Sequence, residues 1–188
     1  MRKQIVIFVF LLSLFLLACG HAEPPEKKLI SDFVAKYNAT VTERNAGSTI
    51  RSARYWITEK GLPYFVLELK NKDIVPTIFL NKSKKDIVMA SVRFDPLEKE
   101  EALAAFDYLF LVLALYTERT YPEIMDALLP VVNDDKEMAI YSDKMNRFYH
   151  IRKERQEGSD FIAIIAVDKT GKKLYSMSSK ELREITHD

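Results

Sequence analysis

Residues 87–115 read IVMASVRFDPLEKEEALAAFDYLFLVLAL, and this stretch predicts a strand followed by a long apolar helix. In its first part, apolar residues alternate with other residues and so share one face of a strand: Val88, Ala90, Val92 and Phe94. Asp95 is expected to cap the helix, with Pro96 in the first turn and Glu98 completing a capping box. The helix is then expected to run to about Tyr116.

The apolar run 102–115 inside this helix has two interpretations, a membrane span and a buried central helix. A span needs about 20 apolar residues. The run is shorter and contains Asp107, so we expect a buried central helix. Because an unpaired buried carboxylate is costly, Asp107 is expected at the rim of the core or beside a basic partner.

The rest of the chain predicts helices and short strands. Helices are expected at 26–45, at 121–132 and from Ser178 onward. Gly47 is expected to form the C-cap of the first of these. Strands are expected at 50–58, 63–69, 75–80, 87–94, 137–142, 147–153, 160–167 and 173–177. Phe161 to Val167 is apolar on both faces, which is typical of a central strand.

These elements predict an α+β protein in which one or more antiparallel sheets pack against the long central helix. Their order can be read as two α-ββββ-α halves, residues 28–117 and 121–188. The alternative is one undivided domain, since no residue-level repeat supports a duplication.

The N-terminus has the layout of a secretory signal peptide. Arg2 and Lys3 precede an apolar run over 5–18, which ends in Leu16-Leu17-Ala18-Cys19. This ending resembles the lipobox of bacterial lipoproteins. The resemblance implies a signal peptide over 1–18 and cleavage before Cys19. It also implies acylation of Cys19 with chains such as palmitate.

The same resemblance implies a location at the cell membrane or the outer membrane, facing the periplasm or the exterior. Asp after the acylated Cys tends to retain such proteins at the inner membrane, so Gly20 favours the outer membrane where the host has one. Residues 19–27 are then the lipidated Cys and a tether, extended at Pro24-Pro25, and residues 28–188 are a single globular domain.

Charge and cysteine usage narrow the possible functions. Lys and Arg number 28 and Asp and Glu 27, so no long-range attraction to nucleic acid is expected. Cys19 is the only cysteine, and once it is acylated no disulfide can form within the chain. The fold therefore depends on its apolar core.

Catalytic and metal-binding patterns are weak. Of the three histidines, His21 lies in the tether, His187 is next to the C-terminus and His150 lies in a predicted strand. The sequence contains no HxH, HExxH, Gly-x-Ser-x-Gly or glycine-rich loop. Asp134 and Asp135 with Glu137 lack the spacing and glycine of a calcium loop, which favours a solvated loop. We therefore expect no catalytic residue, metal or cofactor, and a protein that is not an enzyme.

Aromatic and basic residues are the remaining candidates for contact with a ligand or partner. The aromatic candidates are Tyr55, Trp56, Tyr64, Phe106 and Phe110, for which core packing is the alternative role. The basic candidates are Lys82, Lys84, Lys85, Arg152, Lys153 and Arg155. They can contact lipid headgroups or an acidic partner, or simply solvate turns.

The sequence therefore predicts a lipid-anchored cell-envelope protein that is not an enzyme and binds another envelope protein. One alternative is an envelope enzyme with a scattered active site. The other is a carrier of a small apolar ligand or lipid, held between the sheet and the central helix. Its cavity would be lined by Ala102, Leu103, Phe106, Leu109, Phe110 and Leu113.

Overall fold

A computed structural model describes residues 24–45, 47–70, 74–95, 97–134, 136–156 and 159–167, with only the backbone at 154–156, 159–163 and 165. The expected signal peptide, Cys19, most of the tether, the strand at 173–177 and the helix from Ser178 lie outside the described residues. The possible duplication therefore stays a prediction.

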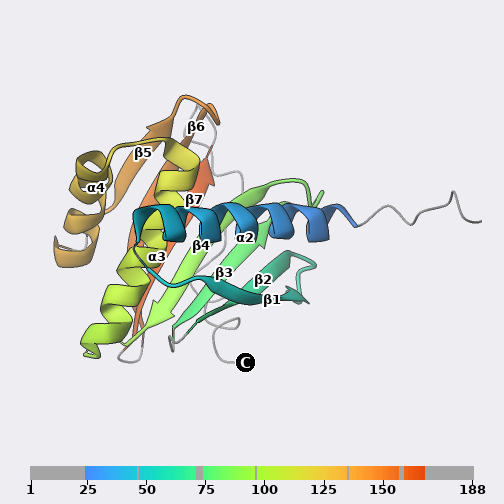
Figure 1. Ribbon diagram of the computed structural model, residues 1–188, viewed down its shortest axis with the longest axis horizontal. Helices are drawn as coiled ribbons and strands as arrows, with labels where there is room; N and C mark the ends of the chain where they lie inside the picture. Colours follow the sequence, from blue (N-terminus) through green and yellow to red (C-terminus); the bar gives the residue numbers. More distant parts are fainter. Residues whose placement is uncertain are drawn as a thin grey trace, which may run out of the picture.

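The described elements follow the order that the sequence predicted (Figure 1). The helices are α2 (Pro25–Arg44), α3 (Lys99–Thr117) and α4 (Tyr121–Asp134). The strands are β1 (Ile50–Ile57), β2 (Pro63–Leu69), β3 (Val75–Leu80), β4 (Ile87–Phe94), β5 (Met138–Ser142), β6 (Arg147–Gln156) and β7 (Ser159–Val167).

All seven described strands form one antiparallel sheet in the order β1-β2-β3-β4-β7-β6-β5. It consists of two meanders, β1–β4 and β5–β7, which join where β4 pairs with β7 through Ala90 and Ile164. The prediction that 160–167 is a central strand is confirmed, because β7 lies between β4 and β6. The α+β class is confirmed as well.

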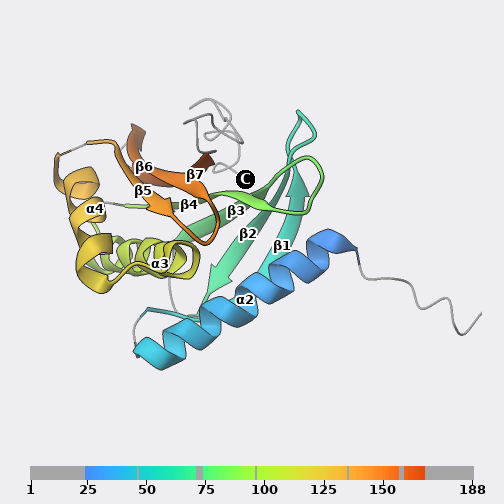
Figure 2. The ribbon, with the colours of Figure 1, turned by 90° about the horizontal axis from the view of Figure 1, so that it is seen from above.

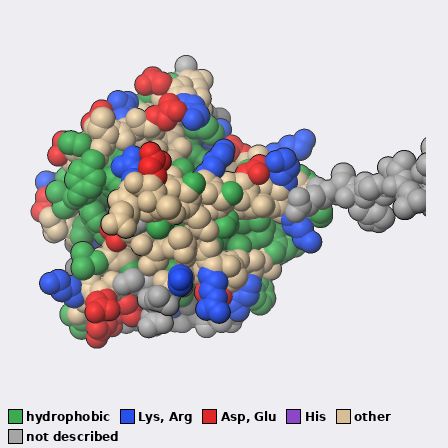
Figure 3. All heavy atoms as spheres, in the orientation of Figure 1, with side chains coloured by type: hydrophobic (Ala, Val, Ile, Leu, Met, Phe, Trp, Pro, Cys, Tyr) green, Lys and Arg blue, Asp and Glu red, His purple; other side chains and the backbone are tan. Residues whose placement is uncertain are grey.

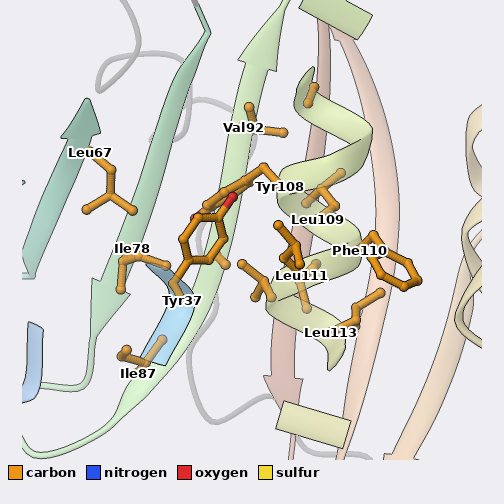
Figure 4. Close-up of a cluster of buried hydrophobic side chains, with 14 of the residues drawn as sticks. Tyr37, Leu67, Ile78, Ile87, Val92, Tyr108, Leu109, Phe110, Leu111 and Leu113 are labelled. Atoms are coloured by element: carbon orange, nitrogen blue, oxygen red, sulfur yellow. The ribbon is translucent and has the colours of Figure 1, made fainter. Parts of the chain in front are cut away.

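The three helices lie on the same face of the sheet (Figure 2). In the core between the two layers, Tyr37 of α2 meets Tyr108 of α3 next to Ile78 and Val92 of the sheet (Figure 4). Leu109 and other large residues of α3 are fully buried there. The expected buried central helix is confirmed, and no helix in the described ranges is long and apolar enough to cross a membrane.

The start of α3 differs from the prediction. The helix begins at Lys99, and its N-cap residue, Glu98, makes no side-chain capping bond. Asp95 does not cap it either: its Oδ1 accepts a 2.9 Å hydrogen bond from the Leu97 N–H. Glu101 reaches back and accepts a 2.9 Å bond from the Asp95 N–H. The capping-box prediction was wrong because Asp95 forms a local turn before the helix instead.

The prediction that Gly47 caps the first helix was also wrong. Asn45 occupies that position, with a left-handed φ of 49°, which Asn tolerates better than most residues. Gly47 has a φ of 74°, and a Cβ added to it would lie 2.8 Å from Leu111 Cδ1. The glycine therefore allows the loop after α2 to approach α3 closely.

Helix α2 begins within the segment expected to be tether. Pro25 is its first residue, a position where proline is favoured because no N–H is needed there. The extended backbone that the sequence predicted at Pro24-Pro25 therefore ends at Pro24.

Asn38 attaches α2 to the edge strand β1. Its side-chain amide donates a 3.0 Å hydrogen bond to the Ile50 carbonyl, and its Oδ1 accepts a 2.7 Å bond from the Ile50 N–H. One side chain thus meets both backbone groups of an edge residue, as a neighbouring strand would.

Candidate functional site

An exposed apolar surface extends over α3 and α4, and we call it the α3–α4 patch. Its exposed members are Leu103, Tyr121 and Leu129, and it is completed by the partly buried Phe106 and Met125 and the buried Phe110. In Figure 3 hydrophobic side chains gather over these two helices at the left of the molecule.

The contribution of α3 follows from its helical spacing. The face that carries Tyr108 and Leu109 is buried against the sheet and α2. Leu103, Phe106 and Phe110 are three and four residues apart, so they share another flank. Leu103 is 56% exposed at one end of this flank, and Phe110 is buried at the other.

Helix α4 contributes a second flank. Its buried stripe is Ile124, Ala127, Leu128 and Val131. Tyr121, Met125 and Leu129 follow one another at four-residue intervals beside that stripe. Tyr121 is 57% exposed and Leu129 is 41% exposed. The apolar face of α4 is therefore wider than the part of it that packs into the core.

A ring contact joins the two flanks. The rings of Phe110 and Tyr121 are 5.0 Å apart at a tilted angle, and the guanidinium of Arg44 lies 5.5 Å from the centre of the Phe110 ring. Arg44 is the last residue of α2, so three helices meet at this point. The patch thus combines aromatic and aliphatic surface with a cation at its rim, a composition typical of protein-binding surfaces.

The five aromatic residues named from the sequence do not form one site. Phe106 and Phe110 belong to the α3–α4 patch. Tyr55 and Trp56 lie on β1 at the far end of the sheet, and they point to opposite faces because neighbouring strand residues alternate. Tyr64 is buried and stacks on Phe79, with ring centroids 5.4 Å apart.

In the part of the chain that the structure describes, the six residues expected to line a carrier cavity differ widely in burial. Leu109 and Leu113 are fully buried, whereas Leu103 points to the surface. Leu113 does line a cavity between α3 and the sheet, together with residues such as Val112 and Tyr149, and the volume of this cavity is ≈ 10 Å³. This volume is about that of a single water probe, so a ligand would have to displace packed side chains there.

Some of the charged candidates have structural contacts. Lys153 Nζ donates a 2.6 Å hydrogen bond to the Val132 carbonyl near the end of α4. Asp134 pairs with Lys136 at 3.1 Å. His150 Nδ1 lies 3.1 Å from Glu137 Oε1. Among the described residues no group of three or more potential ligands could hold a metal ion.

Four tyrosines form the main group of titratable side chains in the core. Burial raises the pKa of Tyr37, with a smaller contribution from the charge of Asp107, and burial also raises the pKa of Tyr108 and of Tyr116. Burial raises the pKa of Tyr149 to about 12. These hydroxyls therefore stay protonated at neutral pH.

No protein-family model, curated protein or solved structure matches this chain. The functional argument therefore rests on the chain's own residues, and the α3–α4 patch is the surface on which it is built.

Sequence reasoning missed the part that α4 plays in this surface. Tyr121, Met125 and Leu129 were assigned no contact role, and Leu103 was considered only as a cavity residue. The signal was present in the spacing of α4, where a stripe at 121, 125 and 129 adjoins the stripe needed for the core.

Proposed function

We propose that this protein is a lipid-anchored module of the cell envelope, not an enzyme, that binds another envelope protein through the α3–α4 patch. The observation that supports a binding role is the exposure of Leu103, Tyr121 and Leu129 on adjacent helices. Large apolar side chains gathered on a surface commonly mark an interaction site.

The position of the patch fits an anchor at the N-terminus. The chain resembles lipoproteins at Cys19, six positions before Pro25, so full extension allows about 20 Å between the acylated residue and the start of α2. The start of α2 and the whole of α4 lie at opposite ends of the molecule in both views (Figures 1 and 2). A protein anchored in this way presents the patch away from the bilayer.

The composition of the patch defines the partner's chemistry. Tyr121 offers rigid aromatic surface and packs on the buried Phe110, and the partly buried Met125 offers an adaptable side chain. Arg44 at the rim can meet a carboxylate. The partner is therefore a protein surface with exposed apolar side chains and an acidic residue at the edge of the contact.

Site-specific photocrosslinking in intact envelopes tests this proposal. A photoreactive phenylalanine analogue is placed at Leu103, Tyr121 or Leu129 of the full chain, and at Val75 as a control. Val75 is exposed but lies on β3, where strand alternation places it on the face of the sheet opposite Ile78 and the helices. We expect the same discrete adduct from the three patch positions and none from Val75.

A substitution provides the second arm of the test. Leu129→Asp should abolish the adduct formed from Tyr121, while circular dichroism and the melting temperature stay close to those of the parent chain. An adduct with twice the mass of the chain would identify a second copy and overturn the proposal of a different partner. Equal adducts from Val75 and the patch, or none at all, would also overturn it.

A further inference from the structure

The end of the molecule opposite the α3–α4 patch carries a distinct combination of aromatic and basic side chains. We call it the tether end, and its members come from the start of α2, the end of β1 and two turns: Lys27, Lys28, Tyr55, Trp56, Ile57, Lys60, Lys82, Lys84 and Lys85. In Figure 3 Lys and Arg side chains gather near the start of α2, at the right of the molecule.

Side-chain contacts hold these segments together although they are far apart in sequence. Lys84, in the turn between β3 and β4, forms a 3.0 Å ion pair with Glu26 in the first turn of α2. The same Lys84 Nζ lies 5.3 Å from the centre of the Tyr55 ring. A surface hollow of ≈ 430 Å³ between α2 and the turn is lined by Lys28 and Lys85 among others.

The charge of this surface is positive. Glu26, Asp32 and Asp86 are held in ion pairs with Lys84, Lys28 and Arg147 respectively, and Glu59 is a further acidic residue in the turn after β1. Lys27, Lys82 and Lys85 are exposed around these pairs, with Lys60 beside Glu59. The cations therefore outnumber the carboxylates.

Exposed apolar residues lie at the end of β1, where Trp56 points to the face of the sheet opposite Tyr55. Trp56 is 49% exposed and Ile57 is 56% exposed at the end of β1. Tryptophan and tyrosine favour the interface between lipid headgroups and water, where their rings and polar atoms are both accommodated. Lysines favour anionic headgroups.

We infer that the tether end docks on an anionic phospholipid surface, with Trp56 at the headgroup level and Lys27, Lys82 and Lys85 against lipid phosphates. The inference rests on the proposed lipid anchor, which keeps Pro25 within about 20 Å of the membrane. The tether end is the surface that this restraint brings to the bilayer. Charge complementarity then orients the domain with the α3–α4 patch outward.

Trp56 is the only tryptophan in the chain and reports directly on the docking. The full chain, purified from bacterial membranes, is reconstituted on vesicles of phosphatidylglycerol or of phosphatidylcholine. Flotation measures attachment, and quenching of Trp56 fluorescence by brominated lipid measures depth. We expect flotation with both vesicles, but a blue shift and strong quenching only with phosphatidylglycerol.

A triple variant with Lys27→Gln, Lys82→Gln and Lys85→Gln tests the role of charge. It should still float through its anchor, but the fraction docked should fall by about tenfold or more, as should that of the parent chain at high salt. The matched control replaces Lys99, Lys136 and Lys144, which are exposed elsewhere, and should behave as the parent chain does.

The two proposals fail in different ways. Two outcomes would overturn the docking inference alone. In the first, the chain floats with both vesicles but Trp56 is not quenched. In the second, Trp56 is quenched equally on both lipids and the triple variant is quenched to the same extent. Flotation with phosphatidylglycerol only would support docking and overturn the lipid anchor. No flotation with either vesicle would overturn both.

Discussion

Arg147 Nη1 lies 2.7 Å from Asp86 Oδ2, although the two residues are 61 positions apart. The pair joins the first residue of β6 to the turn between β3 and β4. Both side chains are half-buried, and Tyr116 and Tyr149 lie close enough to be affected by their charges. One ion pair thus connects the two meanders of the sheet at their rim.

Removing one partner of this pair should destabilise the fold. Asp86→Asn or Arg147→Met is expected to lower the free energy of unfolding by about 1–2 kcal/mol, because the remaining charge is left without its partner in a half-buried position. Urea unfolding measures this. The Lys28–Asp32 pair is the control: at 2.8 Å it is equally short but exposed, and Asp32→Asn should cost less than about 0.5 kcal/mol. Equal losses in the two variants would contradict the role of burial.

Loss of a hydroxyl should stabilise the core at Tyr37 and Tyr108. Both hydroxyls are buried without a hydrogen-bond partner in the part of the chain that the structure describes. Tyr37→Phe and Tyr108→Phe should each raise the free energy of unfolding by about 1 kcal/mol, since an unsatisfied buried polar atom is removed. The control is Tyr141→Phe, which loses a 2.6 Å bond to Asn146 Oδ1 and should not stabilise. Destabilisation by Tyr37→Phe would contradict this prediction.

The buried tyrosines Tyr37, Tyr108 and Tyr116 predict that the fold loses stability in alkali. Their pKa values are raised in the folded chain, whereas in the unfolded chain they titrate near pH 10. Above that pH the unfolded state has lost protons that the folded state retains, so the free energy of unfolding falls with pH. Each buried tyrosine adds about 1.4 kcal/mol per pH unit to the slope. Urea unfolding between pH 9 and pH 11 measures it, and the variant with both Tyr37→Phe and Tyr108→Phe should show a shallower slope. An unchanged slope in that variant would contradict the assignment.

Two glycines with the same backbone conformation should respond differently to alanine. Gly47 has a φ of 74° and Gly61 has a φ of 75°, so alanine is strained at both positions, by about 1 kcal/mol. Only at Gly47 would the new Cβ meet Leu111 Cδ1, at 2.8 Å, while nothing lies within 4 Å of it at Gly61. Gly47→Ala should therefore cost about 1–2 kcal/mol more than Gly61→Ala. Equal melting temperatures for the two variants would contradict this prediction, because they would show that Leu111 and α3 shift to accommodate the new Cβ without loss of stability.

The sequence predicted the described elements well because their periodicity is local. The strand pattern ending at Phe94 and the apolar run 102–115 predicted β4 and α3 correctly. The ends were less predictable. The carboxylates of Asp95, Glu98 and Glu101 can all accept capping hydrogen bonds. Which backbone N–H donates to each carboxylate depends on the path of the chain between β4 and α3. The prediction for Gly47 was wrong because a side chain at this position would collide with Leu111, which lies 64 positions later in the chain. That close approach depends on the tertiary structure.

The candidate site was only partly predictable. Tyr55 and Trp56 are neighbours in one strand, and strand alternation alone would have placed them on opposite faces. The approach of Phe110 to Tyr121 depends on how α3 and α4 pack, which neither helix determines by itself. Lys84 was recognised as a basic candidate, but its contacts with Glu26 and Tyr55 required the tertiary structure.

Helix α2 separates the two ends of the molecule. Its 20 residues span about 30 Å, from Pro25 at the tether end to Arg44 beside Phe110. Mobile ions screen exposed charges over about 8 Å at physiological ionic strength. The electrostatic interaction between the lysines at one end and Arg44 at the other is therefore almost completely screened. The density of anionic lipid can therefore vary at the first end without altering how Arg44 attracts a carboxylate at the second.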